Sequence, residues 1–194
     1  MKQLRVIGID PGLSGGIAVK DYQHPVKVYK MPRGVEAMKR FFTELQTGKD
    51  VIFLEKVMVM RNDQMEPGKA FGIEKMLRGY NEMRTVLLML GFLLIDVYPV
   101  SWQSYLHTRI KGKKEAKKDR KNRYKRIAQE RYPEIKATLW NSDALLILEY
   151  GRKKLKYEPE AIKMAAIKSH QLQKWEQLQL RIYGNDYMKN ECNN

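Results

Sequence analysis

Leu4-Arg5-Val6-Ile7-Gly8-Ile9-Asp10-Pro11-Gly12 is the stretch from which the architecture of this chain can be worked out. Its first six residues form a largely apolar, β-branched run bounded by turn signals, which predicts a buried strand. Asp10 stands at the end of that strand, and Pro11-Gly12 turns the chain directly after it. Gly15-Gly16 then opens a second short strand that runs to Lys20, and these small residues are expected to keep the space in front of Asp10 open for a ligand or for a close approach of the backbone. A solvated aspartate would explain Asp10 alone, whereas the glycines favour a ligand of a divalent metal ion.

The chain carries a large excess of positive charge. Its 194 residues include 37 Lys and Arg against 22 Asp and Glu, a formal net charge of +15. An excess of this size favours nucleic acid or another polyanion as a partner, because Lys and Arg release counterions from phosphates. The length and the 43% of hydrophobic residues indicate one globular domain. With one cysteine, no apolar run of membrane-spanning length and no signal-peptide pattern, we expect a cytosolic protein without membrane association.

Apolar periodicity predicts strands that alternate with helices. The expected strands cover residues 4–10, 15–20, 26–31, 50–55 and 93–97, and the expected helices cover 35–47, 69–90, 100–107, 124–132, 142–150 and roughly 159–183. Gly151 is a suitable residue to follow the end of the 142–150 helix. Gly72 and Gly79 lie inside the 69–90 helix and suggest close packing of a partner element there. A strand that follows a crossover helix lies parallel to the first strand, so Glu55 is expected near Asp10.

Three acidic residues border apolar segments: Asp10, Glu55 and Asp143. A helix cap or an ion pair would explain each one alone, and for Asp143 a first-turn acid favoured by the helix dipole is an equal alternative. Carboxylates held a few ångströms apart repel one another unless a cation lies between them. Oxygen-only ligands suit Mg²⁺ or Mn²⁺ better than zinc, and the histidines and the single cysteine fit no zinc-binding spacing. Two such ions on shared carboxylates are a recurring arrangement for phosphodiester hydrolysis.

The segment 109–126 holds eleven Lys or Arg and two acidic residues, a net charge of +9 in 18 residues. A solvated, disordered segment is the ordinary explanation of such a run, but its place beside the predicted carboxylates favours contact with phosphates. The candidate phosphate contacts are Lys111, Lys113, Lys114, Lys117, Lys118, Arg120 and Lys121. Met58, Met60 and Phe71 are candidates to wedge against bases, with ordinary packing as an equal alternative.

The chain resembles the RuvC family of Holliday junction resolvases, within the RNase H-like superfamily, in three motifs: Ile7–Gly12, Leu54-Glu55 and Ser142–Ile147. Arg78-Gly79 on the long helix adds to the resemblance, which covers about residues 4–151. Two further features resemble bacteriophage-type members of the family. They are the turn with Pro99, Trp102 and Gln103, and the lysine-rich run before Tyr132-Pro133. The resemblance implies an α/β fold with a mixed five-stranded sheet flanked by helices. It implies a nuclease domain over 1–155 and a C-terminal helical extension over 156–194.

The activity that this resemblance implies is that of a homodimer that resolves four-way DNA junctions by paired symmetric nicks, in DNA recombination and repair. It implies two Mg²⁺ or Mn²⁺ ions, with Asp10, Glu55 and Asp143 as catalytic metal ligands. The expected compartment is the cytoplasm, at the nucleoid or in the host of a phage. Family members usually carry an acid or a histidine three positions before the last aspartate. Trp140 stands there in this chain, and Asn141 is the neighbouring oxygen donor.

Three alternatives stay open from the sequence. The first is an RNase H-like nuclease that acts on RNA or on RNA–DNA hybrids. The second, motivated by Trp140, is a junction-binding protein with weak catalysis. The third is an actin-like ATPase, whose opening motif is similar, although 194 residues are too few for the two lobes of that fold.

Overall fold

A single mixed sheet forms the centre of the molecule. The computed structural model describes residues 4–58, 69–110, 115–168, 171 and 174. The strands are β1 (Arg5–Ile9), β2 (Gly16–Lys20), β3 (Lys27–Lys30), β4 (Asp50–Glu55) and β5 (Leu93–Val97), in the order β3-β2-β1-β4-β5. The first three pair as an antiparallel meander, and β4 and β5 continue the sheet parallel to β1. The five strands predicted from the sequence are therefore confirmed.

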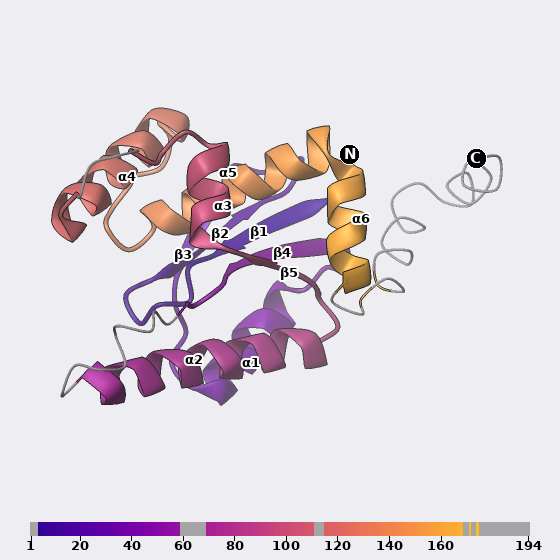
Figure 1. The fold of residues 1–194 in the computed structure, drawn as a ribbon. Helices are drawn as coiled ribbons and strands as arrows, with labels where there is room; N and C mark the ends of the chain where they lie inside the picture. The colour runs from indigo at the N-terminus through magenta and orange to yellow at the C-terminus, as the bar shows by residue number, and fades with distance from the viewer. Residues whose placement is uncertain (1–3, 59–68, 111–114, 169–170, 172–173, 175–194) are drawn as a thin grey trace.

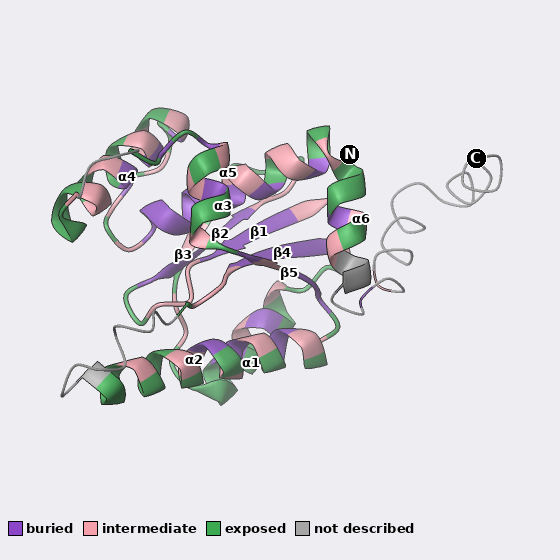
Figure 2. Ribbon diagram, in the orientation of Figure 1, coloured by how far each residue is buried: buried purple, intermediate pink, exposed green. Residues whose placement is uncertain are grey.

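Helices cover both faces of this sheet (Figure 1). One face carries α1 (Val35–Leu45) and α2 (Lys69–Met89), and the other carries α3 (Pro99–Tyr105), α4 (Lys117–Arg131), α5 (Ser142–Tyr157) and α6 (Pro159–Lys168). Burial on both faces explains why β1 and β4 are almost continuously apolar rather than alternating. Figure 2 shows β1, β2, β4 and β5 as mostly buried, whereas β3 at the edge of the sheet is partly exposed.

The helix α5 lies directly on β1 because β1 has a glycine at the contact. A Cβ atom on Gly8 would lie 2.4 Å from the backbone nitrogen of Leu148 and 2.6 Å from the carbonyl oxygen of Ala144. No larger residue allows two backbones to approach so closely. This contact fixes the position of α5 on the sheet, and with it the position of the first turn of α5 relative to the end of β1.

Two helix boundaries before α6 differ from the prediction by more than two residues. The helix α4 begins at Lys117, seven residues before the predicted start at Tyr124, because Arg123 pairs with Glu115 at 2.6 Å and secures its first turns. The helix α5 does not end at Gly151 but continues to Tyr157. The prediction of a helix over 159–183 agrees with α6 as far as Lys168 but is wrong at Gln171, which is not helical, and the remainder lies largely outside the described residues.

Gly151 and Gly79 have roles opposite to those predicted. Gly151 lies inside α5, where an added Cβ atom would come within 2.4 Å of the ring of Phe53, so this glycine permits α5 to pack on β4. Gly72 and Gly79 were expected to be packed against a partner element, yet among the described residues nothing lies within 4 Å of a Cβ added at either position. Close packing therefore accounts for the glycine in α5 and not for the two in α2.

These two helical glycines form a matched pair for a stability test. Replacing either by alanine gains about 1 kcal/mol of helix propensity, but only at position 151 must the new methyl group displace a buried ring. We expect Gly151→Ala to lower the free energy of unfolding by about 1–3 kcal/mol and Gly79→Ala to raise it by up to about 1 kcal/mol. Urea denaturation of the two variants beside the wild type measures both changes. Equal changes in the two variants would contradict the packing described for Gly151.

The outer side of β5 is covered by a side chain from beyond α6. The amide of Gln171 donates a hydrogen bond to the carbonyl oxygen of Leu94 and accepts one from its N–H, both at 2.9 Å. Gln171 is 4% exposed. Its amide thus takes the place that the peptide group of a sixth strand would occupy. Within the described part of the chain, no helix has the length and apolar character required to cross a membrane.

Candidate metal and nucleic-acid site

Three carboxylates from distant parts of the chain meet at one edge of the sheet. Asp10 follows β1 directly, and Glu55 is the last residue of β4. The parallel register pairs Ile9 with Leu54, so the next residue of each strand, Asp10 and Glu55, are neighbours at the carboxyl ends of both strands. Asp143 lies in the first turn of α5, which the contact at Gly8 places over β1. The structure therefore brings together the three acids that the sequence singles out.

The pKa values of these acids reflect burial and mutual repulsion. Burial raises the pKa of Asp10, the nearby charge of Asp143 raises it further, and Lys121 and the N–H of Gly12 act in the opposite direction. Burial and then the charge of Asp10 raise the pKa of Glu55 to about 8. A carboxyl group with so high a pKa is largely neutral at pH 7, and a bound cation would favour its ionised form. The site thus favours positive charge.

The ammonium group of Lys121 supplies positive charge to the carboxylates. Its Nζ atom lies 2.6 Å from Oδ2 of Asp143 and 4.0 Å from Oδ2 of Asp10. Burial opposes the charged form of Lys121, but its ion pair with Asp143 and the charge of Asp10 outweigh burial and raise its pKa. Since α4 is held by Arg123, which pairs with Glu115, Lys121 reaches the site from an anchored helix.

Glu55 and Asp10 are each oriented by a neighbouring N–H group. The indole nitrogen of Trp102 donates a hydrogen bond of 2.8 Å to Oε1 of Glu55. Trp102 is fully buried, and its ring packs edge-on against that of Tyr124 with 5.2 Å between centroids. The backbone N–H of Gly12 donates to Oδ1 of Asp10 over 3.2 Å. Sequence reasoning missed the contact of Trp102 with Glu55, because 47 residues separate the two and nothing local indicates it.

Gly15 and Gly16, at the start of β2, allow other parts of the protein to approach closely. A Cβ atom on Gly15 would lie 2.1 Å from the carbonyl oxygen of Asp10, and one on Gly16 would lie 2.9 Å from the ring of Trp140. Of the two uses expected for these small residues, the close approach of the backbone is therefore confirmed at Gly15. They allow the chain to fold back on Asp10 and allow Trp140 to pack on the start of β2.

Asn141, the candidate oxygen donor next to Trp140, forms hydrogen bonds within the loop before α5. Its Oδ1 accepts a hydrogen bond of 2.7 Å from the N–H of Thr138, and its Nδ2 donates to the carbonyl oxygen of Lys136 over 3.2 Å. The residue is 1% exposed. This arrangement stabilises the loop that precedes Asp143 and uses the oxygen that a metal ion would need. We therefore leave Asn141 out of the ligand set proposed below.

The donor atoms of the three acids suit a hard divalent cation, because all are carboxylate oxygens. The three carboxylates and the single ammonium group of Lys121 leave an excess of negative charge when all are ionised. In the described ranges, however, no three or more His, Cys, Asp and Glu side chains are arranged closely enough to hold a metal ion. Lys121 pairs with two of the three acids. The residues thus fit such an ion in chemistry, and side-chain adjustment around Lys121 is needed to bind it.

A cavity of about 670 Å³ opens beside Asp10 and Glu55. Basic side chains line it from three separate segments: Lys56, Arg109 and Arg120. Met58 and Met76 add an apolar part to the wall, and Met58 is 46% exposed. Sequence reasoning missed Lys56 and Arg109 as lining residues, although Lys56 directly follows Glu55. A cavity with carboxylates and surrounding cations suits a phosphate-containing ligand that binds with a metal ion.

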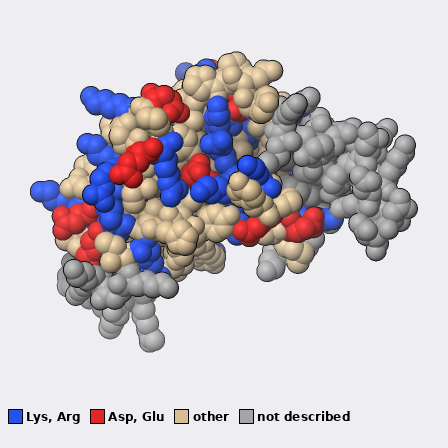
Figure 3. Space-filling model, turned by 90° about the horizontal axis from the view of Figure 1, so that it is seen from above, with Lys and Arg blue, Asp and Glu red and all other residues tan. Residues whose placement is uncertain are grey.

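Of the other predicted contacts, some are exposed without belonging to the lining of this cavity, and the rest fall outside the described residues. Lys117 and Lys118 are exposed at the start of α4, and Phe71 is 71% exposed on α2. Lys111, Lys113, Lys114 and Met60 lie outside the described residues. Figure 3 looks onto the side of the molecule that α4 and α5 cover and shows many Lys and Arg side chains there, with fewer acidic ones between them.

Comparison with solved structures identifies the fold. The chain is similar to Thermus thermophilus RuvC in complex with a Holliday junction substrate, with 16% sequence identity and a TM-score of 0.50 over 80% of this chain and 96% of that chain. A second Thermus thermophilus RuvC structure matches with 18% identity and a TM-score of 0.47, over 79% of this chain and 96% of that one. No protein-family model and no curated protein sequence matches the chain. The RuvC-like, RNase H-type α/β fold predicted from the sequence is thus confirmed.

Proposed function

We propose that this protein is a metal-dependent endonuclease that cuts branched DNA, resolving four-way junctions by paired nicks. The observation that carries the proposal is the meeting of Asp10, Glu55 and Asp143, from three separate elements, beside a cavity lined by basic residues. The RuvC-like fold supports it, since the structure that this chain resembles holds a Holliday junction substrate. A net charge of +15 fits a phosphate backbone as the ligand.

The proposed ligands of two Mg²⁺ or Mn²⁺ ions are Asp10, Glu55 and Asp143. Such ions activate the attacking water and stabilise the leaving oxygen in phosphodiester hydrolysis. The protein holds the carboxylates in place through Trp102 and the N–H of Gly12. Lys121 offsets part of their repulsion before metal binds, and its ammonium group is then available to a phosphate oxygen beside them.

The proposed assembly is a homodimer, because paired nicks need two sites. The N-terminal half of α2 is the proposed interface, since Phe71 and Met76 are 71% and 40% exposed there. The last turns of α2, by contrast, bury Met83 and Leu87 completely in the core. We also propose that residues 156–194 extend the nuclease domain of residues 1–155, because α6 contributes Ile162 to the core shared with α5 and β5.

A labelled four-way junction incubated with the protein and Mg²⁺ or Mn²⁺ tests the proposed activity. The expected products are two nicks at symmetric positions in opposing strands, formed only with metal present. Linear duplex DNA and an RNA–DNA hybrid of the same sequence serve as controls for substrate class. Faster cutting of the hybrid than of the junction would instead support an RNase H-like ribonuclease, and no metal-dependent cutting of any of the three would contradict a nuclease.

A junction-binding protein with weak catalysis is the second candidate. It is favoured by Trp140, which packs against Gly16 where the RuvC family usually carries a further acid or histidine. This candidate predicts tight junction binding in EDTA and no nicks with Mn²⁺. Metal-dependent nicks at a rate well above that of the Asp10→Asn variant would exclude it.

Trp102→Phe tests the hydrogen bond that orients Glu55. Phenylalanine keeps an aromatic ring against Tyr124 but cannot donate to the carboxylate, so the pKa of Glu55 is expected to rise further. We expect the Mg²⁺ concentration for half-maximal nicking to increase by about 10- to 100-fold and the pH profile to shift to higher pH. Nicking rates measured against Mg²⁺ concentration at several pH values report both changes. An unchanged pH profile with only a lower melting temperature would show that Trp102 has a packing role alone.

A further inference from the structure

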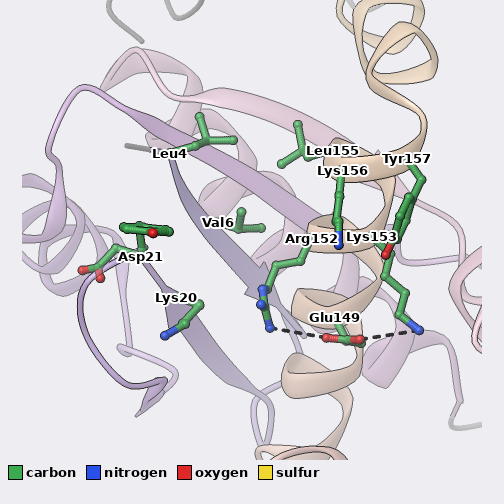
Figure 4. A pocket seen from close by; sticks show the side chains of 11 residues that line it. Leu4, Val6, Lys20, Asp21, Glu149, Arg152, Lys153, Leu155, Lys156 and Tyr157 are labelled. Carbon is green, nitrogen blue, oxygen red and sulfur yellow. Dashed lines mark ion pairs between the residues drawn. The ribbon is translucent and has the colours of Figure 1, made fainter. Parts of the chain in front are cut away.

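A second cavity, of about 500 Å³, lies at the opposite end of β1 from the carboxylates. Its floor is apolar and includes Val6 and Leu155, each 6% exposed. Val6 lies four residues before Asp10, which corresponds to about 13 Å along a strand. Figure 4 shows this cavity between the strands that carry Val6 and Lys20 and the C-terminal half of α5. A ligand bound here is therefore separate from the carboxylates.

Basic side chains surround this floor from two elements. Lys20 pairs in register with Val6, and directly paired residues of antiparallel strands project to the same face. Lys20 therefore lies on the face that α5 covers. From α5, Arg152 extends toward the strands, and Lys153 and Lys156 line the same cavity (Figure 4). Four cations thus meet two carboxylates, Asp21 and Glu149, around one cavity.

Two of these four basic side chains, Lys20 and Lys156, remain able to bind an anionic ligand. Glu149 pairs with Arg152 at 3.5 Å and with Lys153 at 3.6 Å, so it offsets one of the two positive charges of that pair. Lys20 donates its hydrogen bond to a neutral group, the carbonyl oxygen of His24, at 2.5 Å. Lys156 lies over the ring of Tyr157, 4.8 Å from its centroid. Among the described residues, neither Lys20 nor Lys156 forms an ion pair with a carboxylate, which favours an anionic ligand.

Two tyrosines add exposed aromatic surface to the cavity. Tyr22 is 60% exposed and Tyr157 is 63% exposed, and both belong to its lining. A phosphate ion needs only the cations, whereas an apolar floor with aromatic rings also suits a planar base. Stacking of a base on an aromatic ring, together with a basic groove for its phosphate, is a common way to bind single nucleotide units. The volume is that of an ordinary small-ligand site.

We propose that this cavity binds one nucleotide unit, with its phosphate at the basic side chains of the lining, Lys20 and Lys156 among them, and its base against the apolar floor and Tyr157. The unit is either a free mononucleotide or an unpaired nucleotide of a nucleic-acid strand. The proposal does not depend on nuclease activity, since none of the lining residues belongs to the carboxylate site.

Binding of adenosine monophosphate, inorganic phosphate and a short single-stranded oligodeoxynucleotide to the full chain tests the proposal. Calorimetry or fluorescence anisotropy at physiological salt would be applied to Lys20→Ala/Lys156→Ala and to Tyr157→Ala. The matched control is Lys39→Ala/Arg40→Ala, which removes two charges from exposed positions of α1, outside this cavity and outside the basic segment 109–126. Melting curves check that each variant is folded.

The double variant is expected to weaken binding of the monophosphate or the oligonucleotide at least about tenfold, and the control to weaken it less than twofold. Tyr157→Ala should weaken the base-containing ligands and leave inorganic phosphate unchanged. An effect on the monophosphate identifies a free nucleotide as the ligand, and an effect confined to the oligonucleotide identifies a strand. Equal weakening by the control variant, phosphate binding as tight as that of both nucleotide ligands, or no binding of either nucleotide ligand would overturn the proposal.

Discussion

Asp10→Asn is expected to reduce the rate of junction nicking at least about a thousandfold, which corresponds to about 4 kcal/mol of lost transition-state stabilisation. Asparagine has the same shape and can still accept the hydrogen bond from the N–H of Gly12. It lacks the negative charge that a divalent cation requires, and the loss of a metal ion removes several kcal/mol of charge stabilisation. Single-turnover nicking of a labelled junction measures this loss.

Junction binding should change little in the same variant, because the basic residues around the cavity are unaffected. We expect the dissociation constant in EDTA to stay within about threefold of the wild type. Asp119→Asn, the same chemical change at an exposed position of α4, is the control and should keep nearly full nicking activity. If Asp10→Asn cuts at the wild-type rate in a preparation free of contaminating nucleases, Asp10 does not bind a catalytic metal.

Glu55 is expected to make the metal-free protein less stable as the pH rises from about 4.5 to about 8. Its pKa is about 8 in the folded protein, against an ordinary value of 4.5. Over this window the folded state keeps a proton that the unfolded state has lost, so the free energy of unfolding falls with increasing pH. Glu55→Gln removes the ionisation. At pH 8.5 the free energy of unfolding of the variant is expected to exceed that of the wild type by at least about 1 kcal/mol, which corresponds to roughly 2–4 °C in melting temperature.

The comparison of pH values and of metal content makes this prediction specific. Near pH 4 the carboxyl group is mostly neutral in both states, and the two proteins should be nearly equally stable. Mg²⁺ should stabilise the wild type at pH 8.5 more than it stabilises Glu55→Gln, because a bound cation favours the ionised carboxylate. At limiting Mg²⁺, nicking by the wild type should also rise with pH toward about 8. Glu36→Gln, an exposed position of α1, serves as control, and a stability difference that does not vary with pH would contradict the assignment.

The strands could be predicted closely because their apolar runs are dense and end at turn residues. β4 and β5 have the predicted bounds, and the parallel register then places Glu55 beside Asp10 by geometry alone. The start of α4 could not be predicted in the same way. Its first two turns are almost entirely charged and show no apolar period, and they are secured by Arg123 and Glu115. Gly151 misled the prediction because a glycine that ends a helix and one that permits close packing have the same local sequence pattern.

The site was only partly accessible from sequence. The three acids stand out because each borders an apolar segment. Lys121, by contrast, is one of seven basic candidates, and no feature of the neighbouring sequence distinguishes it from the other six. Its proximity to Asp143 depends on how α4 packs on α5, 22 residues further along the chain. The same holds for Lys56 and Arg109, which line one cavity from separate segments. Contacts that depend on tertiary packing leave no periodic pattern in the sequence.

The glutamine at position 171 limits how copies of this protein can associate. An open sheet presents unpaired backbone groups along its outermost strand, and a strand from another molecule can add to them. At β5 the amide of Gln171 already satisfies both backbone groups of Leu94. A second chain could extend the sheet past β5 only after displacing this buried side chain. Amyloid-like growth from that edge of the sheet is therefore disfavoured. Loss of the segment that carries Gln171 would expose the backbone groups of Leu94 to pairing with a strand of another molecule.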